Sequence, residues 1–175
     1  MPAVILIGPP GAGKSSVGRS LAQRLNLELR DTDTLIEKRI GLPISEIFLD
    51  KGEDFFRERE REVLLEELEN FSGVLALGGG SVLDPISSQA LVATGDPIVF
   101  LDVSLSSAAP RIGFNRDRPL LVGNPRAKWQ ELMNHRRPIY EKLATFTVST
   151  DSATPSQIAI KIAEKLADRK ATDDK

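Results

Sequence analysis

The sequence predicts an α/β protein, a three-layer α/β/α sandwich in which helices cover both faces of a central five-stranded parallel sheet. Two observations support this prediction. Short apolar runs alternate with longer segments of helical periodicity, which is the pattern of βαβ units. The apolar runs are continuous rather than alternating, so the strands are expected to be buried on both faces, as in a parallel sheet.

Five apolar runs are expected to form the strands. The first, residues 3–7 (AVILI), is the clearest because it is wholly apolar and rich in β-branched residues. The second, residues 27–30 (LELR), is the weakest because it is short and half polar. The expected strands are 3–7, 27–30, 74–77, 97–101 and 146–149.

Helices are expected between the strands. The long charged segment 54–70 carries an apolar stripe that includes Phe56 and Val63. The last helix follows TPSQ at 154–157, a capping box with proline in the first turn. The expected helices are 14–25, 33–40, 45–51, 54–70, 85–93, 105–112, 125–143 and one that begins at about 155.

The composition excludes several classes of function. With 175 residues, 41% of them hydrophobic, the chain is expected to form one domain over residues 1–175. A net charge of −2 argues against nucleic acid as a partner, because such binding depends on a surplus of Lys and Arg. The absence of cysteine excludes disulfides, thiolate catalysis and zinc–sulfur sites, and suits the reducing cytoplasm.

Location, assembly and metal type are also constrained. The apolar run at 3–7 is too short for a signal peptide or a membrane span, so a cytoplasmic protein with no membrane partner is expected. A monomer is expected because no long apolar surface stripe is left over. The single histidine, His135, is expected to face solvent, which leaves any divalent metal to oxygen ligands.

The stretch GPPGAGKSS at residues 8–16 matches the nucleotide-binding motif G-x-x-x-x-G-K-[ST]. It lies between an expected strand and an expected helix, so its backbone N–H groups can converge on phosphates at the positive end of a helix. The alternative is a glycine turn that only caps the helix. ATP or GTP binding is therefore expected, with Lys14 on the β- and γ-phosphates and Ser15 on Mg²⁺. The nucleotide-binding residues of this loop are Gly8, Pro10, Gly11, Ala12, Gly13, Lys14, Ser15 and Ser16.

Three further segments are expected at the carboxyl ends of the strands, where open α/β sheets bind ligands. Asp31 and Asp33 follow the second strand, and Asp33 has the alternative role of a helix N-cap. Arg57 stands in FFRERERE, where most charges are expected on a solvated face. Three glycines at 78–80 leave room for a ligand. These features indicate a phosphotransferase with an acidic, hydroxylated acceptor.

The order of motifs along the chain resembles that of the shikimate kinases. The P-loop is followed by D-x-D at 31–33, FFRxxE at 55–60, GGG at 78–80, an arginine before PLL, and R-x-P-x-Y at 136–140. The resemblance implies a P-loop kinase of the nucleoside monophosphate kinase-like fold with a mobile lid. It also implies Mg²⁺-dependent transfer of the γ-phosphate of ATP to the 3-hydroxyl of shikimate, in aromatic amino-acid biosynthesis.

The resemblance assigns roles to the residues that handle the phosphate. Asp33 resembles the carboxylate that binds the shikimate hydroxyls and orients or deprotonates the attacking one. Asp31 resembles the carboxylate that holds Mg²⁺ through water beside Ser15. Arg118, in NRDRPLL, resembles the arginine of a lid, here about 113–124, for which an ordinary surface loop is the alternative. The implied catalytic residues are Asp33, Lys14 and Arg118.

The resemblance places the acceptor-binding region at about 33–60. Arg57 and Arg136 resemble the pair that binds the shikimate carboxylate, and Glu60 resembles a carboxylate that positions Arg57. The pattern R-x-P-x-Y selects Arg136, whereas the adjacent Arg137 faces about 100° away on a helix. The implied substrate-binding residues are Asp33, Phe48, Phe56, Arg57, Glu60, Gly78, Gly79, Gly80 and Arg136.

The nucleotide base and the acceptor leave alternatives open. Family members often present a basic residue to adenine in the loop before the last helix, but residues 150–156 contain none. Arg111 can stack on adenine instead, through its guanidinium plane. A related kinase for gluconate or a nucleoside monophosphate would not require all the acceptor residues named above. A non-catalytic nucleotide-binding relative would lack Asp33, Lys14 or Arg118.

Overall fold

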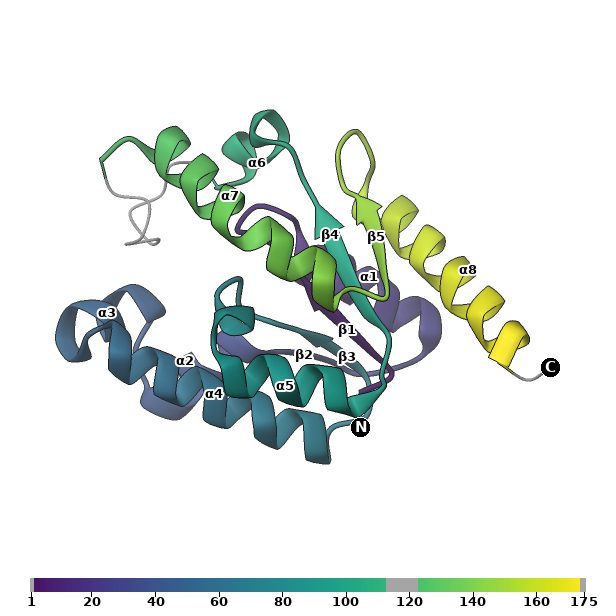
Figure 1. Cartoon of the computed structure of the whole chain (residues 1–175), viewed down its shortest axis with the longest axis horizontal. Coiled ribbons are helices and arrows are strands. Elements are labelled where there is room, and N and C mark those ends of the chain that lie inside the picture. Colours follow the sequence, from purple (N-terminus) through teal and green to yellow (C-terminus); the bar gives the residue numbers. More distant parts are fainter. Residues whose placement is uncertain (1, 113–122, 174–175) are drawn as a thin grey trace.

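The central sheet has five parallel strands in the order β2-β3-β1-β4-β5, with β1 in the middle (Figure 1). The computed structural model describes residues 2–112 and 123–173 of the chain. Ile5 of β1 pairs with Leu75 of β3 and with Ile98 of β4, so the predicted α/β fold with a five-stranded parallel sheet is confirmed. The strands are β1 (Val4–Ile7), β2 (Leu29–Asp31), β3 (Val74–Ala76), β4 (Ile98–Asp102) and β5 (Phe146–Ser149).

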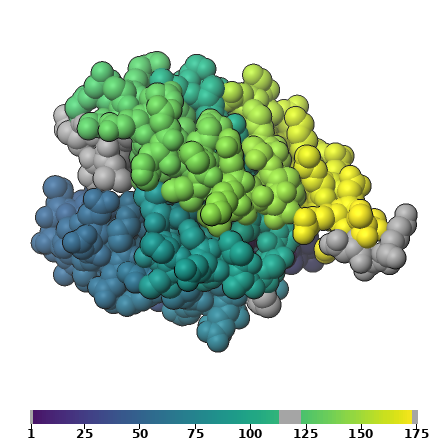
Figure 2. All heavy atoms as spheres, in the orientation of Figure 1, coloured from purple at the N-terminus to yellow at the C-terminus, as the bar shows by residue number. Residues whose placement is uncertain are grey.

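Helices cover both faces of this sheet. Helices α1 and α8 pack against each other on one face, whereas α4, α5 and α7 cover the other. Figure 2 shows α7, in green, lying above α5, in teal. None of the helices within residues 2–112 and 123–173 combines the length and the apolarity needed to cross a membrane. The helices are α1 (Lys14–Leu25), α2 (Thr32–Ile40), α3 (Ile44–Lys51), α4 (Glu53–Asn70), α5 (Pro85–Thr94), α6 (Leu105–Ile112), α7 (Pro125–Leu143) and α8 (Pro155–Asp173), with a 3₁₀ turn, η1, at Ser81–Leu83.

Apolar side chains form two separate cores. The larger core lies between the sheet and its flanking helices and includes all four residues of β1. The smaller core consists of Ile36, Ile47, Phe56 and Val63, which come from α2, α3 and α4. The three helices that join β2 to β3 therefore have a packing unit of their own, beside the carboxyl ends of those strands.

The boundary of β2 differs from the predicted one, and a helix cap explains the difference. Asn26 ends α1 in the left-handed conformation, with a φ of 53°, and the N–H of Leu27 bonds back to the helix. Residues predicted as the start of the strand therefore belong to the cap, and β2 begins at Leu29. The predicted capping box of α8 is present, since Thr154 and Gln157 each accept a hydrogen bond from the other's backbone N–H.

Candidate active site

The P-loop joins β1 to α1 at the carboxyl edge of the sheet. Gly11 and Gly13 have φ angles of 82° and 84°, a left-handed conformation that favours glycine. The Lys14 ammonium lies over the loop, where Nζ donates hydrogen bonds to the carbonyl oxygens of Gly8, at 2.7 Å, and Pro9, at 3.0 Å. The loop thus curls around the first turn of α1, a geometry that gathers backbone N–H groups around a phosphate.

Ser15 and Asp31 meet beside the P-loop. Ser15 Oγ donates to Asp31 Oδ2 at 2.6 Å, while Asp31 Oδ1 accepts from the backbone N–H groups of Asp33 and Thr34 at 3.0 and 3.4 Å. Asp31 is therefore the N-cap of α2, and the alternative in which Asp33 caps this helix was wrong. Because Asp31 caps the helix, the side chain of Asp33, in the first turn of α2, is not needed for capping.

The two oxygen atoms of Ser15 and Asp31 suit a hard divalent cation. Mg²⁺ takes one or two protein oxygens and completes its shell with waters and substrate phosphates. No group of three or more His, Cys, Asp or Glu side chains able to hold a metal occurs in the described part of the chain. The donor set therefore fits an Mg²⁺ that relies on the nucleotide for most of its ligands.

The glycine run after β3 is packed against charged side chains. A Cβ built on Gly78 would lie 2.5 Å from Oδ1 of Asp33 and 2.7 Å from Oε1 of Glu60. One built on Gly80 would collide with the guanidinium of Arg57. None of the three glycines has a positive φ angle, so space rather than backbone conformation requires glycine here.

A buried carboxylate holds Arg57 in place. Nη1 of Arg57 donates a hydrogen bond to Oε2 of Glu60 at 2.7 Å, and Glu60 lies one turn further along α4. Glu60 is only 3% exposed, and its Oε1 accepts a hydrogen bond from Ser81 Oγ at 2.9 Å. Both carboxylate oxygens are therefore engaged, and charge-assisted bonds of this kind fix the orientation of a guanidinium.

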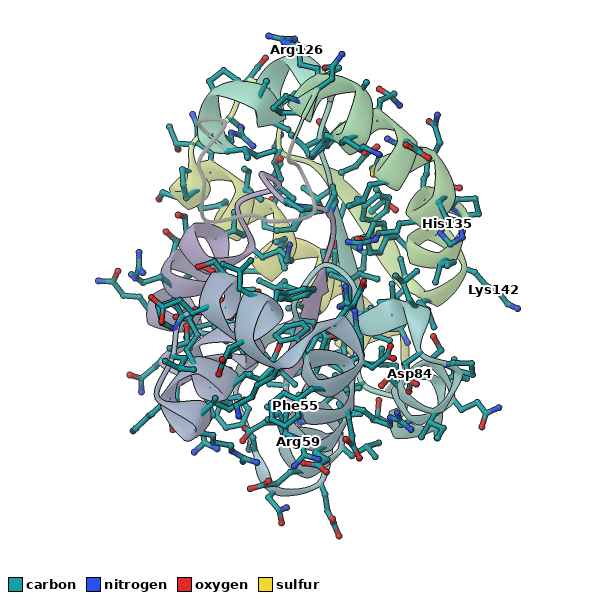
Figure 3. All side chains as sticks on the ribbon, turned by 90° about the vertical axis from the view of Figure 1, so that its left-hand side faces the viewer. Phe55, Arg59, Asp84, Arg126, His135 and Lys142 are labelled. Atoms are coloured by element: carbon teal, nitrogen blue, oxygen red, sulfur yellow. The ribbon has the colours of Figure 1, made fainter. Side chains whose placement is uncertain are left out.

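The adjacent residues Arg136 and Arg137 face different surroundings. Arg136 is 6% exposed, and a Cβ on Gly79 would lie 3.3 Å from its Nη1. Arg137 instead forms a bidentate ion pair with Asp102, with both N···O distances at 2.9 Å. The structure therefore brings Arg136, and not Arg137, to the glycine run. His135 is exposed on the outer side of α7 (Figure 3).

Two aromatic rings extend the surface that carries Arg57. The ring centroids of Phe48 and Phe56 are 4.8 Å apart, with an interplanar angle of 38°. Phe56 is buried and Phe48 is half-buried, so the second ring keeps part of its surface accessible. The guanidinium of Arg57 lies 5.3 Å from the centroid of Phe56. An apolar wall therefore stands beside a cationic group.

Arg111 lies between the P-loop and the segment that follows β5. Its guanidinium donates to the carbonyl oxygen of Gly11 at 3.2 Å, to Thr150 Oγ1 at 3.1 Å and to the carbonyl oxygen of Thr150 at 2.7 Å. These bonds hold its plane in one orientation, as stacking on a base requires.

The predicted lid falls largely outside the described residues. Arg118 and the rest of residues 113–122 are not described, so the structure does not bear on the role predicted for them. The described end of the segment leads into α7, where Oδ1 of Asn124 accepts a hydrogen bond from the N–H of Ala127 at 3.2 Å. Asn124 therefore caps the helix that carries Arg136.

Sequence reasoning missed two buried hydroxyl groups at this site. Thr32 is fully buried, and its Oγ1 accepts a hydrogen bond from the N–H of Gly78 at 3.0 Å. Ser81 supports Glu60, as described above. The position of Thr32 inside the D-x-D motif was a signal that could have found it, whereas a serine after glycines carries no such signal.

Sequence reasoning also found no hydrogen-bonding role for two aromatic residues of α7, since Trp129 was expected only to pack and Tyr140 only to complete the R-x-P-x-Y motif. Tyr140 donates from its hydroxyl to the carbonyl oxygen of Gly79 at 2.6 Å, and Trp129 donates from Nε1 to the carbonyl oxygen of Pro10 at 2.8 Å. Burial raises the pKa of Tyr140 to about 12, so its hydroxyl remains a donor at neutral pH. Tyr140 closes the R-x-P-x-Y motif, and its i+4 spacing from Arg136 could have indicated a shared face.

The fold and the site together define the class of the protein. A parallel sheet with a P-loop after its central strand, and polar side chains gathered at the carboxyl ends of β2 and β3, is the architecture of a small-molecule P-loop kinase. A family model, Shikimate kinase, matches residues 10–167. The chain belongs to the shikimate kinase family.

Individual relatives agree with this assignment over nearly the whole chain. The shikimate kinase of Salinispora arenicola is 49% identical over 166 residues, which are 95% of this chain and 98% of the relative. That of Thermobifida fusca is 49% identical over 165 residues, 94% of this chain and 95% of the relative. The solved structure of shikimate kinase from Acinetobacter baumannii in complex with shikimate is 36% identical, with a TM-score of 0.91 over 95% of this chain and 93% of that chain. The family predicted from the sequence motifs is confirmed.

Proposed function

We propose that the protein transfers the γ-phosphate of ATP to the 3-hydroxyl of shikimate, giving shikimate 3-phosphate and ADP, in the biosynthesis of aromatic amino acids through chorismate. The observation that carries the proposal is the gathering of Arg57, Arg136 and Asp33 around the glycine run beside the P-loop. Two guanidinium groups and a carboxylate match an acceptor that has one carboxylate and several hydroxyls. Family membership supports the same substrate.

The proposed acceptor lies over the glycine run. Arg57 gives one N–H to Glu60 and keeps others for the acceptor's carboxylate, because a guanidinium has five donors. Arg136 approaches the same region from α7, where it lies close to Gly79. Phe48 and Phe56 form an apolar wall for the ring, and the missing side chains of the glycines leave it space.

The proposed chemistry is an in-line displacement. The acceptor's hydroxyl oxygen forms a bond to the γ-phosphorus while the bond from that phosphorus to the bridging oxygen of ADP breaks. Asp33 orients the hydroxyl and accepts its proton. Lys14 and Arg118 balance the charge of the transferring group, and closure of a lid at 113–124 would exclude water.

Ser15 and Asp31 are the residues proposed to hold Mg²⁺, Ser15 through its hydroxyl and Asp31 through a water molecule. The bound ion supplies positive charge at the β- and γ-phosphates. The 2.6 Å hydrogen bond between the two side chains supports this assignment, because it shows that both oxygens reach one point beside the P-loop.

The proposed acceptor can be tested with a coupled ADP-release assay. Purified protein with ATP and Mg²⁺ is offered shikimate, gluconate and AMP in parallel, and turnover is expected with shikimate alone. Turnover with gluconate or AMP would assign the related-kinase alternative instead. Folded protein that binds ADP but turns over none of the three would be a non-catalytic relative, and the proposal would fail.

We further propose a cytoplasmic monomer with a single kinase domain over residues 1–175. The co-substrate ATP is available in the cytoplasm. Among the described residues, only four large hydrophobic side chains are exposed. Size-exclusion chromatography with light scattering should give the 19.1 kDa mass of one chain, whereas twice that mass would indicate a dimer.

A further inference from the structure

Helix α7 contacts both glycine loops through two buried side chains. Trp129 donates to the carbonyl oxygen of Pro10 in the P-loop at 2.8 Å, and Tyr140 donates to the carbonyl oxygen of Gly79 at 2.6 Å. Trp129 is 2% exposed and Tyr140 is 0% exposed, so water does not compete for either bond. One helix therefore holds one peptide group in each loop.

The spacing of these residues puts them on one face of α7. Trp129 and Tyr140 are eleven residues apart, close to three helical turns, which separates them by about 17 Å along the axis. Arg136 lies seven residues after the first and four before the second, so it shares that face. The helix thus reaches the P-loop near one end and the glycine run near the other, with Arg136 in between.

Each contact fixes the orientation of a peptide plane. The peptide bonds that follow Pro10 and Gly79 are trans, so each carbonyl points opposite to the N–H of the next residue. With both carbonyls turned toward α7, the N–H groups of Gly11 and Gly80 face away from it. Peptides that involve glycine rotate easily, so an anchor has the greatest effect at such positions.

The two loops also lie close together. A Cβ built on Gly79 would lie 3.3 Å from the carbonyl oxygen of Gly8 and 3.4 Å from Cδ of Pro10. A rotation of either peptide therefore changes the relative position of the glycine run and the P-loop. Phosphoryl transfer depends on this relative position, since a misplacement of about 1 Å can reduce a rate by about 100-fold.

We propose that Trp129 and Tyr140 are positioning residues, which orient one peptide of the P-loop toward the nucleotide phosphates and one peptide of the glycine run toward the acceptor. The inference rests on the proposed function, since shikimate is the acceptor that Tyr140 serves. The two residues have separate effects, because each hydrogen bond ends on a different loop.

The test uses substitutions that remove each hydrogen-bond donor but keep an aromatic ring. Tyr140→Phe keeps the ring that stacks on Phe100, whose centroid is 5.1 Å away, and Trp129→Phe keeps an aromatic side chain. Thr94→Val is the control, because it removes a side-chain hydrogen bond to the carbonyl oxygen of Leu91, and one from the N–H of Asp96, at the opposite edge of the sheet. Dissociation constants of the binary complexes with ADP and with shikimate are measured by calorimetry, together with both KM values, kcat and the thermal midpoint.

Tyr140→Phe is expected to raise the dissociation constant and KM for shikimate about ten-fold while changing ADP binding less than about two-fold. Trp129→Phe is expected to raise the dissociation constant for ADP about ten-fold while changing shikimate binding less than about two-fold. Thr94→Val is expected to change the binding of neither ligand. Equal losses for both ligands in either variant, or no loss in either, would overturn the proposal. If the wild-type protein showed no turnover with shikimate, the proposed function would be contradicted instead. The effect of Trp129→Phe on ADP binding would still test the role proposed for Trp129 at the P-loop.

Discussion

The hydroxyl of Ser15 lies 2.6 Å from Oδ2 of Asp31, so the first turn of α1 and the end of β2 present two oxygen atoms to one point. The other carboxylate oxygen of Asp31 caps α2 through the backbone N–H of Asp33. These two roles of Asp31 are separable, because asparagine caps helices about as well as aspartate but carries no charge.

We expect Asp31→Asn to raise the Mg²⁺ concentration needed for half-maximal activity about 10- to 100-fold, the usual effect of losing an outer metal-binding partner. The thermal midpoint should change little, because the cap is retained. Activity measured as a function of Mg²⁺ at fixed ATP checks the first point and thermal unfolding the second. An unchanged Mg²⁺ requirement would show that Asp31 does not act on the metal.

Asp33→Asn should separate catalysis from nucleotide binding. Removing a general base typically lowers kcat by about 100-fold or more, whereas the side chain is not needed by the P-loop. Calorimetry should therefore give an ADP dissociation constant within about two-fold of wild type. Asp50→Asn, on the exposed side of α3, is the control and should leave both quantities unchanged. Loss of ADP binding in Asp33→Asn would place this carboxylate on the nucleotide side.

The two neighbouring arginines of α7 should behave differently. Arg136→Ala is expected to raise the KM for shikimate about 10- to 100-fold, the effect of losing hydrogen bonds to a charged group. Arg137→Ala should leave that KM nearly unchanged and lower stability by at most about 1 kcal/mol, because its ion pair with Asp102 is partly exposed. Steady-state kinetics of both variants decide the assignment. A larger KM effect at Arg137 would reverse it.

The sheet could be predicted because each central strand is a continuous apolar run, and such a run has few other stable environments. The residue that caps the helix after β2 could not be predicted, because Asp31 and Asp33 are both good capping residues two positions apart. The choice depends on pairing with β3, which extends the strand to Asp31 opposite Ala76 and so forces the helix to begin after it. That pairing is a tertiary contact, which local pattern does not contain.

The polar contacts of the site were partly predictable for the same reason. Arg57 and Glu60 lie one helical turn apart, so their pairing follows from spacing alone. The hydrogen bond that Gly78 donates to Thr32 and the one that Tyr140 donates to Gly79 join residues 46 and 61 positions apart. Only the fold brings such residues together, although motif order had already indicated which segments would meet.

Gly80→Ala offers a selective test of the acceptor side. A Cβ at this position collides with the guanidinium of Arg57, the far end of a long side chain, so Arg57 shifts and its bond to Glu60 is weakened while the backbone can stay. The KM for shikimate should rise about ten-fold with the ATP KM nearly unchanged, and the thermal midpoint should fall because the buried Glu60 loses part of its pairing. Gly79→Ala is expected to be less selective, because its Cβ also approaches Gly8 and Pro10 of the P-loop.

A double variant shows whether Gly80→Ala acts through Arg57. If it does, adding Gly80→Ala to Arg57→Ala should change the shikimate KM little beyond the single Arg57→Ala value, because the colliding group is already gone. Additive effects would instead mean that the methyl group occupies space needed by the acceptor itself.

The single tyrosine of the chain permits a direct titration. Burial raises the pKa of Tyr140 to about 12 and outweighs the opposite effect of the Arg136 charge, whereas an unfolded chain titrates near 10. The stabilisation that comes with the neutral phenol is thus complete below pH ~10 and is lost as the pH rises to ~12, a change of about 3 kcal/mol.

Ultraviolet absorbance of the phenolate should show a midpoint near 12 in the native protein and near 10 in denaturant. The thermal midpoint of Tyr140→Phe should fall less steeply over this range than that of wild type, and a native midpoint near 10 would mean that the hydroxyl is not buried against Gly79.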